Sequence, residues 1–158
     1  MVLSERITFR EPNVMKSGTV GVAVDHGGFP LKKFVIDEMQ QLGLEVSDLG
    51  TDSEDSVDYP DFADKLVAAI AGGRVAQGVL ICGTGIGISI AANRHPSIRA
   101  ALCYDEETAV LARQHNDANV LCLGGRKTDE ETARKMVRAF FGTKSEGGRH
   151  ARRVAKMS

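Results

Sequence analysis

Short apolar segments, the first of them rich in β-branched residues, alternate along this chain with longer segments in which apolar residues recur every three or four positions. The short segments cover residues 19–24, 44–49, 79–82, 99–103 and 120–123. Segments of the first kind predict buried strands, and those of the second kind predict amphipathic helices. Five strands, each followed by a helix, predict an α/β fold with a doubly wound, Rossmann-like, five-stranded parallel sheet and helices on both faces.

Local signals indicate where several of these helices begin and end. Pro30 suits the first turn of a helix, and Gly43 is placed to end it. Thr128 and Glu131 have the spacing of a capping box and predict the start of the last helix. The remaining helices are expected over residues 61–71, over residues 86–92 and around residues 110–113.

The strand and helix pattern occupies only part of the chain. We interpret residues 1–18 as an N-terminal extension and residues 19–158 as a single domain. From about residue 143 the sequence becomes basic and contains a Gly147-Gly148 hinge, which predicts a C-terminal arm.

Composition excludes several classes of partner. The chain has 158 residues, a formal net charge of −1 and no apolar run near the length of a membrane span, which argues against nucleic-acid and membrane binding. Three cysteines without a CxxC spacing indicate reduced thiols, and therefore a cytoplasmic location.

The strongest candidate for chemistry is a thiol followed directly by a glycine-rich loop. Cys82 ends the third strand and is followed by Gly83, Thr84, Gly85, Ile86 and Gly87, which we call the glycine loop. Backbone N–H groups of such a loop, together with the start of the next helix, can bind an oxyanion and stabilise a thiolate. Cys82 is therefore a candidate base or nucleophile, although a buried structural cysteine gives the same local pattern.

The residues that follow the glycines distinguish this loop from other known phosphate-binding loops. A P-loop needs a lysine, and a cysteine phosphatase loop needs an arginine, where this chain has Ile88. The dinucleotide-binding pattern G-x-G-x-x-G differs from the G-x-G-x-G found here, although Asp105 lies at a suitable distance downstream.

Further polar residues lie just beyond the carboxyl ends of predicted strands, where doubly wound proteins bind their ligands. Asp25 and His26 end the first strand, where they either form a turn before the first helix or contact a ligand. His115 and Asn116 follow a helix, and we expect them in a loop at the same ligand-binding edge. Histidine suits proton transfer near neutral pH, although a helix-capping role explains His115 equally well.

Three arginines are candidates for binding a phosphate group. Arg126 follows the fifth strand, and Arg149 and Arg153 lie in the basic tail. Guanidinium groups match phosphate oxygens, so we expect the three to converge on one dianion.

Five ordered motifs within residues 19–155 resemble those of type B ribose-5-phosphate isomerases, a group of sugar-phosphate isomerases that also includes galactose-6-phosphate and allose-6-phosphate isomerases. The motifs are Asp25-His26-x-Gly28-Phe29, Asp58-Tyr59-Pro60, Ile81-Cys82-Gly83-Thr84-Gly85-Ile86-Gly87, Arg113-Gln114-His115-Asn116-Asp117 and Glu146-Gly147-Gly148-Arg149-His150-x-x-Arg153.

The resemblance implies an aldose–ketose isomerase without metal or cofactor that interconverts ribose 5-phosphate and ribulose 5-phosphate through a cis-enediolate. It implies that Cys82 is the base and that His115 assists ring opening. The resemblance also implies which residues bind the substrate. The glycine loop would bind the enediolate oxygens, Asp25 and Asn116 would bind hydroxyl groups, and the phosphate would be bound by His26, Arg126, Arg149 and Arg153.

The resemblance also implies a homodimer or homotetramer whose active sites are shared between chains. Some members of the group use a glutamate as the base, and Cys82 places this chain with the cysteine branch. An isomerase of a hexose 6-phosphate or tetrose phosphate, and a nucleotide- or sugar-phosphate-binding module without turnover, remain alternatives.

Overall fold

A computed structural model of the protein describes residues 18–157, so most of the expected N-terminal extension lies outside the described residues. The elements, in chain order, are β1 (Thr19–Val24), α1 (Phe29–Gln41), β2 (Glu45–Asp48), α2 (Tyr59–Ala71), β3 (Gln77–Cys82), α3 (Ile86–Asn93), β4 (Ala100–Leu102), α4 (Glu106–Asn116), β5 (Val120–Gly124), α5 (Glu130–Gly142) and α6 (Arg149–Ala155).

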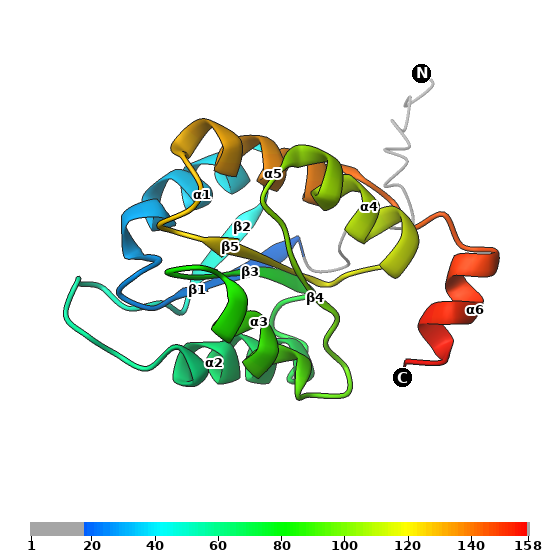
Figure 1. Cartoon of the computed structure of the whole chain (residues 1–158), viewed down its shortest axis with the longest axis horizontal. Helices are drawn as coiled ribbons and strands as arrows, with labels where there is room; N and C mark the ends of the chain where they lie inside the picture. Colours follow the sequence, from blue (N-terminus) through cyan, green and yellow to red (C-terminus); the bar gives the residue numbers. More distant parts are fainter. Residues whose placement is uncertain (1–17, 158) are drawn as a thin grey trace, which may run out of the picture.

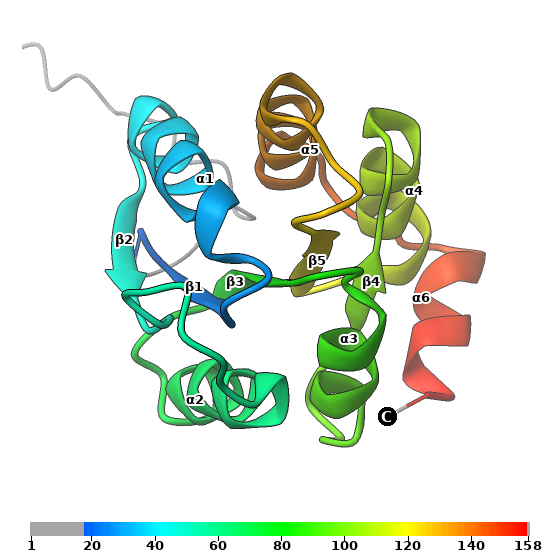
Figure 2. The ribbon, with the colours of Figure 1, turned by 60° about the vertical axis from the view of Figure 1, so that its left-hand side comes forward.

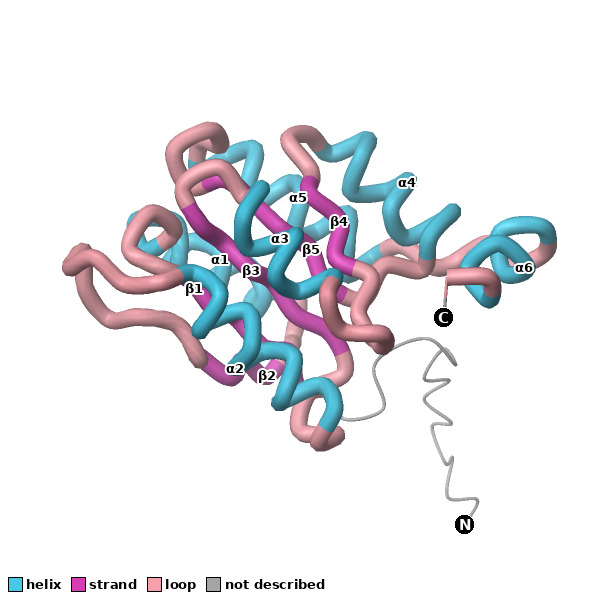
Figure 3. The backbone as a smooth tube through the Cα atoms, turned by 60° about the horizontal axis from the view of Figure 1, so that its bottom comes forward, coloured by secondary structure: helices cyan, strands magenta, loops and turns pink. Residues whose placement is uncertain are grey.

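The strands form one parallel sheet in the order β2-β1-β3-β5-β4. Helices α1, α4 and α5 cover one face, and α2 and α3 cover the other (Figures 1 and 2). Figure 3 shows α2 and α3 in front of the central strands. The predicted doubly wound α/β fold is confirmed.

Burial of the strands follows from their positions in this sheet. The central strands β1, β3 and β5 are buried almost throughout, as expected for parallel strands covered on both faces. Alternate residues point to opposite layers, so Val22 packs under α1 and α5 whereas Ala23 faces α2 and α3. Cys82 belongs to the layer with α2 and α3.

The end of α1 and the start of α5 test the helix boundaries that local sequence signals predicted. Gly43 follows the C-cap of α1 with φ of +80°, which confirms it as the residue that ends this helix. The predicted capping box at Thr128 is wrong. Asp129 is the N-cap of α5, and its side chain accepts a hydrogen bond from the N–H of Thr132. The Asp129 carboxylate, one residue after Thr128, caps the helix in place of the Thr128 hydroxyl, and the positive end of the helix also stabilises its charge.

The basic tail ends in a short helix that the hydrophobic pattern did not indicate. Residues 143–148 follow α5 without forming a helix or strand, and α6 then packs beside the end of α4 (Figure 2). His150 is the buried residue of α6 and anchors it. Its neighbours are mostly arginine, which hides the short amphipathic pattern in the sequence.

Candidate active site

The sheet reverses its winding direction between β1 and β3. From β1 the chain moves outward to β2, and from β3 it moves to the other side, where β5 and β4 lie. Asp25 and Cys82 stand at the carboxyl ends of these two neighbouring strands. Ligands of doubly wound proteins bind at such a reversal. A cavity of about 520 Å³ lies at this edge, lined by Asp25, His26, Val57, Asp58, Tyr59, Pro60 and Asp61.

The glycine loop turns back onto the thiol of Cys82. Gly85 has φ of +80°, a left-handed conformation that suits glycine, and its N–H donates a 3.2 Å hydrogen bond to Sγ of Cys82. Helix α3 begins at the next residue, Ile86, and the first turn of a helix leaves N–H groups without intrahelical acceptors. The sulfur atom therefore accepts a hydrogen bond from a backbone N–H at the start of α3, where negative charge is favoured.

Three strand ends meet around this loop with hardly any space between their backbones. A Cβ atom at Gly27 would lie 2.8 Å from the Gly83 nitrogen, and one at Gly124 would lie 2.6 Å from the Thr84 oxygen. The N–H of Gly125 donates to the Cys82 carbonyl oxygen at 2.7 Å. The ends of β1, β3 and β5 thus hold the glycine loop in one conformation.

Asp25 and His26 both make local contacts at this edge. Asp25 is buried, and its Oδ1 accepts a 3.0 Å hydrogen bond from the N–H of Gly28, as the turn interpretation requires. Nδ1 of His26 accepts from the N–H of Val57 at 3.2 Å, which ties the acidic loop, residues 51–58, to the cavity. This bond fixes Nδ1 as the acceptor and leaves Nε2 as the nitrogen that carries the proton in the neutral ring.

The other end of the acidic loop is held by Lys32. Its Nζ lies 2.8 Å from Asp48 and 3.1 Å from Asp52, and it donates to the Thr51 carbonyl oxygen at 2.8 Å. Burial alone lowers the pKa of Lys32, but its bonds to the two carboxylates outweigh this effect and raise the pKa above its ordinary value. Lys32 therefore stays charged and anchors the loop.

Arg126 is the predicted arginine that lies beside the glycine loop. Its N–H donates to the Gly83 carbonyl oxygen at 2.9 Å. Its guanidinium is so close that a Cβ at Gly83 would lie 2.9 Å from Nη1. A positive charge therefore stands next to the glycine loop.

Two tyrosines complete this edge, and neither was among the predicted site residues. The half-exposed ring of Tyr59 lies against Gly87, where a Cβ would come within 2.6 Å of the ring. The hydroxyl of Tyr104 donates to the Thr84 carbonyl oxygen at 2.9 Å. The Asp58-Tyr59-Pro60 motif could have indicated Tyr59, whereas only its position just after β4 could have indicated Tyr104.

His115 and Asn116 lie at the opposite edge of the sheet, so their predicted place at the ligand-binding edge is wrong. Helix α4 starts beyond the carboxyl end of β4 and runs back to the amino end of β5, and these two residues form its last turn. The N–H of Asn119 donates to the carbonyl oxygen of Arg99, which precedes β4. A helix that connects parallel strands must return to the amino edge, so this placement follows from the fold.

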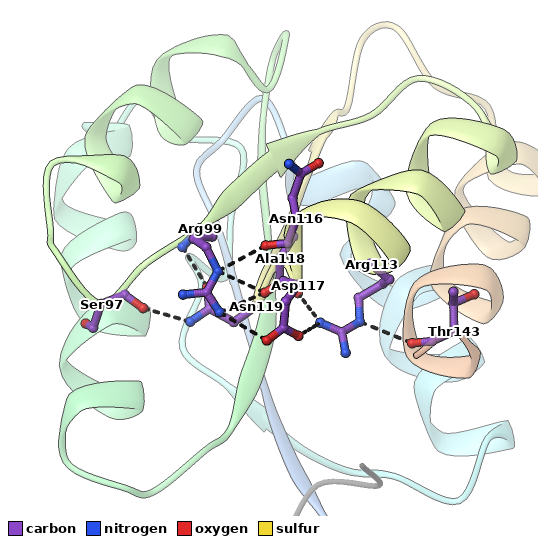
Figure 4. A network of polar contacts seen from close by, with 8 residues as sticks. All are labelled: Ser97, Arg99, Arg113, Asn116, Asp117, Ala118, Asn119 and Thr143. Carbon is purple, nitrogen blue, oxygen red and sulfur yellow. Dashed lines mark hydrogen bonds and ion pairs between the residues drawn. The ribbon is translucent and has the colours of Figure 1, made fainter. Parts of the chain in front are cut away.

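A polar network holds the end of α4 in place (Figure 4). Asp117 has φ of +43° and accepts from Nη1 of Arg113 at 2.8 Å. Arg113 is buried and also donates to the carbonyl oxygens of Ala118 and Thr143. Arg99 donates to the carbonyl oxygens of Asn116 and Asp117. The network fixes the backbone at the end of α4, where His115 and Asn116 lie.

The ring of His115 stacks on that of His150, with centroids 4.2 Å apart and planes inclined by 9°. Burial lowers the pKa of His150, and the charges of His115, Arg149 and Arg153 lower it further, against the opposing effect of Glu146. His150 is therefore neutral at pH 7 and joins α6 to the end of α4.

The predicted phosphate ligands do not converge within one chain. Arg126 stands at the carboxyl edge of the sheet, whereas Arg149 and Arg153 lie one turn apart on α6, at the far side of the molecule (Figure 1). We call Asp25, His26, residues 82–87 and Arg126 the thiol half-site, and His115, Asn116, Arg149 and Arg153 the histidine half-site. One chain presents the two half-sites at opposite edges.

This fold, with a thiol and a glycine loop at the point of reversal, defines an α/β protein built to bind an anionic small molecule at the carboxyl edge of its sheet. Comparison with known proteins makes this class specific. A model of the Ribose/Galactose Isomerase family matches residues 20–157. The chain belongs to this family, as the motifs predicted.

Individual relatives agree with this assignment. Ribose-5-phosphate isomerase B of Escherichia coli is 47% identical over 135 residues, which cover 85% of this chain and 91% of the relative. The structure of a ribose 5-phosphate isomerase from Thermotoga maritima is 49% identical, with a TM-score of 0.85, and the match covers 88% of this chain and 96% of that one. The Clostridium thermocellum ribose-5-phosphate isomerase B is 46% identical, with a TM-score of 0.86 over 88% and 94% of the two chains.

Within residues 18–157, none of the helices combines the length and the apolar character needed to span a membrane.

Proposed function

We propose that this protein interconverts ribose 5-phosphate and ribulose 5-phosphate through a cis-enediolate, with Cys82 as the base. The observation that carries the proposal is the N–H of Gly85 directed at Sγ of Cys82 at the point of reversal in the sheet. Relatives named ribose-5-phosphate isomerase B support the choice of substrate.

In this reaction Cys82 removes the proton from C2 of the open-chain aldose and returns a proton to C1, while O1 gains a proton and the hydroxyl at O2 loses one. N–H groups of the glycine loop bind the enediolate oxygens. Each well-aimed donor of this kind lowers the barrier by about 3 kcal/mol. The loop is held by three strand ends, so its donors need no rearrangement during the reaction.

The histidine half-site supplies the remaining groups in the proposed reaction. His115 moves a proton at the ring oxygen when the furanose opens, and Asn116 and Asp25 hold hydroxyl groups. His26, Arg126, Arg149 and Arg153 bind the phosphate, where guanidinium groups match its charge and geometry.

Because the two half-sites lie at opposite edges, each complete site takes its thiol half-site from one chain and its histidine half-site from another. A homodimer or a homotetramer built from such dimers satisfies this requirement. An exposed apolar face supports it: Ile86, Ile90 and Tyr104 are each about half exposed beside the glycine loop, and the edge strand β4 lies next to them. A partner chain that covers this face brings its α6 to the thiol. The three free cysteines support a cytoplasmic location.

The replacement Cys82→Ser tests the proposed base, with Cys103→Ser as its matched control. Burial raises the pKa of Cys103, which directly follows β4 and has no glycine loop after it. In a coupled isomerase assay we expect Cys82→Ser to lower kcat by about 10²- to 10⁴-fold, the contribution of a general base, and Cys103→Ser to leave it near the wild-type value. Near-normal turnover in Cys82→Ser contradicts the role of Cys82.

A hexose 6-phosphate is the second candidate substrate, because the matched family includes galactose isomerases. The same assay with ribose, allose, galactose and tetrose phosphates distinguishes the two candidates by their kcat/KM values. Titration with nicotinamide and adenine nucleotides tests the nucleotide-binding alternative, and tight binding of either contradicts the isomerase proposal.

A further inference from the structure

A cluster of three potential metal ligands lies at the contact between α4 and α6. Nitrogen atoms of His115 and His150 and a carboxylate oxygen of Glu146 all lie within 4.8 Å of one another. Two imidazoles and a carboxylate form a donor set that binds Zn²⁺ and related ions, with further positions left for water.

His150 gives the second, independent indication of a ligand. Its side chain is only 8% exposed, and within residues 18–157 its Nε2 atom is buried without a hydrogen-bond partner. The nearest carboxylate oxygen, Oε2 of Glu146, lies 3.5 Å away but is not aligned for a hydrogen bond. A buried ring nitrogen without a partner is costly, and a bound cation would satisfy it.

The backbone around the cluster is fixed, whereas its outer side is open. The N–H of Glu146 donates to the Gln114 carbonyl oxygen at 3.0 Å, which ties the segment before α6 to the residue next to His115. Glu146 is about half exposed and His115 is half-buried, so an ion can enter from solvent.

We propose that His115, Glu146 and His150 form a binding site for a divalent transition-metal ion, with Zn²⁺ as the best fit. Ligand atoms of a tetrahedral zinc site lie about 3.3 Å apart, so the widest pair, which is within 4.8 Å, must approach by at most about 1.5 Å. The lone pairs lie in the ring planes, and the two rings are stacked, so one ring must also turn. His115, the less buried ring, makes that movement. The nearby Arg149 and Arg153 oppose a cation, which limits the affinity.

Occupation of this site has a consequence that rests on the proposed function. A metal ion that binds the ring of His115 removes the group that assists ring opening, so the metal inhibits the isomerase. The site is therefore inhibitory and supplies no cofactor to the reaction.

Direct metal binding tests the site without reference to activity. The full chain is titrated with Zn²⁺ by calorimetry and with Co²⁺ by visible absorption, which reports the coordination geometry. We expect one ion per chain, and we expect Glu146→Gln and His150→Ala to weaken binding by about tenfold or more. The matched control is His95→Ala, because His95 also pairs with a carboxylate, Asp64, at 3.2 Å. It should leave the affinity unchanged.

The cysteines are the competing ligands, and Co²⁺ distinguishes them by the intense charge-transfer absorption of thiolate ligation. Equal binding by wild type, Glu146→Gln and His150→Ala overturns the site, as does loss of binding in Cys82→Ser together with a thiolate spectrum. Inhibition is then measured with Zn²⁺ in the assay. Weaker inhibition of Glu146→Gln than of wild type supports the whole proposal. Binding at the cluster without any inhibition supports the metal site but contradicts the role given to His115.

Discussion

Replacement of Gly85 by alanine tests whether the glycine loop holds the thiol in its working position. Gly85 has φ of +80°, and a Cβ there would lie 2.5 Å from Cδ1 of Leu102 and 2.9 Å from the backbone of Leu123. The Leu102 side chain can move, but the Leu123 backbone belongs to β5 and cannot. The loop must therefore shift, and its N–H moves away from Sγ of Cys82.

Gly43 separates the two parts of this effect. It also has φ of +80°, but a Cβ there would meet nothing within 4 Å. An L-residue in this conformation costs about 1–2 kcal/mol, which is the whole cost expected for Gly43→Ala. Overpacking adds about 1–3 kcal/mol in Gly85→Ala, so its free energy of unfolding should fall by about 2–5 kcal/mol.

The two variants should differ still more in activity. Loss of an oxyanion donor lowers kcat by about 10²- to 10³-fold, which we expect for Gly85→Ala, whereas Gly43→Ala keeps the wild-type kcat. Stability is measured by chemical denaturation at one protein concentration, and kcat by the coupled assay with ribose 5-phosphate. Equal stability of the two variants, or wild-type turnover in Gly85→Ala, would refute this reasoning.

Two further predictions concern the phosphate and a helix cap. Arg149→Ala should raise KM for ribose 5-phosphate about tenfold or more, with a smaller change in kcat. Arg152 is an exposed neighbour on α6, and Arg152→Ala should leave KM unchanged. An unchanged KM in Arg149→Ala removes Arg149 from the site. Hydrogen bonds from Thr132 hold the pKa of Asp129 below its ordinary value. The ionised carboxylate therefore stabilises the fold above about pH 4, and this stabilisation is lost as the pH falls through the lowered pKa. Asp129→Ala should therefore lower the Tm at pH 7 but hardly at all in strong acid, and a Tm difference that does not depend on pH contradicts this sign.

The fold could be predicted because its signals are local and repeated. Each central strand is a short apolar run, and the first five helices show an apolar period, so the parallel sheet follows from the order of elements. Helix α6 escaped prediction because it is seven residues long and owes its place to the burial of His150 against α4. Such short helices depend on tertiary packing rather than on their own sequence.

The site was predictable only where its residues follow strands directly. Asp25 and Cys82 end neighbouring strands, and the rule for parallel sheets brings them to one edge. His115 lies at the end of a helix instead. Its chemistry suggested the ligand-binding edge, whereas the direction of the helix places it at the opposite edge. Tyr104 reaches the glycine loop through a tertiary contact that has no sequence signature, whereas Tyr59, which also contacts the loop, lies in the Asp58-Tyr59-Pro60 motif.

The central claim is that Cys82 of one chain and His115 of another act in the same site, and mixed oligomers test it most directly. Cys82→Ala and His115→Ala are first purified separately, and each should have little activity. Co-expression of the two variants then forms mixed dimers, in which one of the two sites receives both intact residues. With random pairing, we predict recovery of roughly one quarter of the wild-type kcat per chain. If both residues served one site within a single chain, the mixture would stay as inactive as its components.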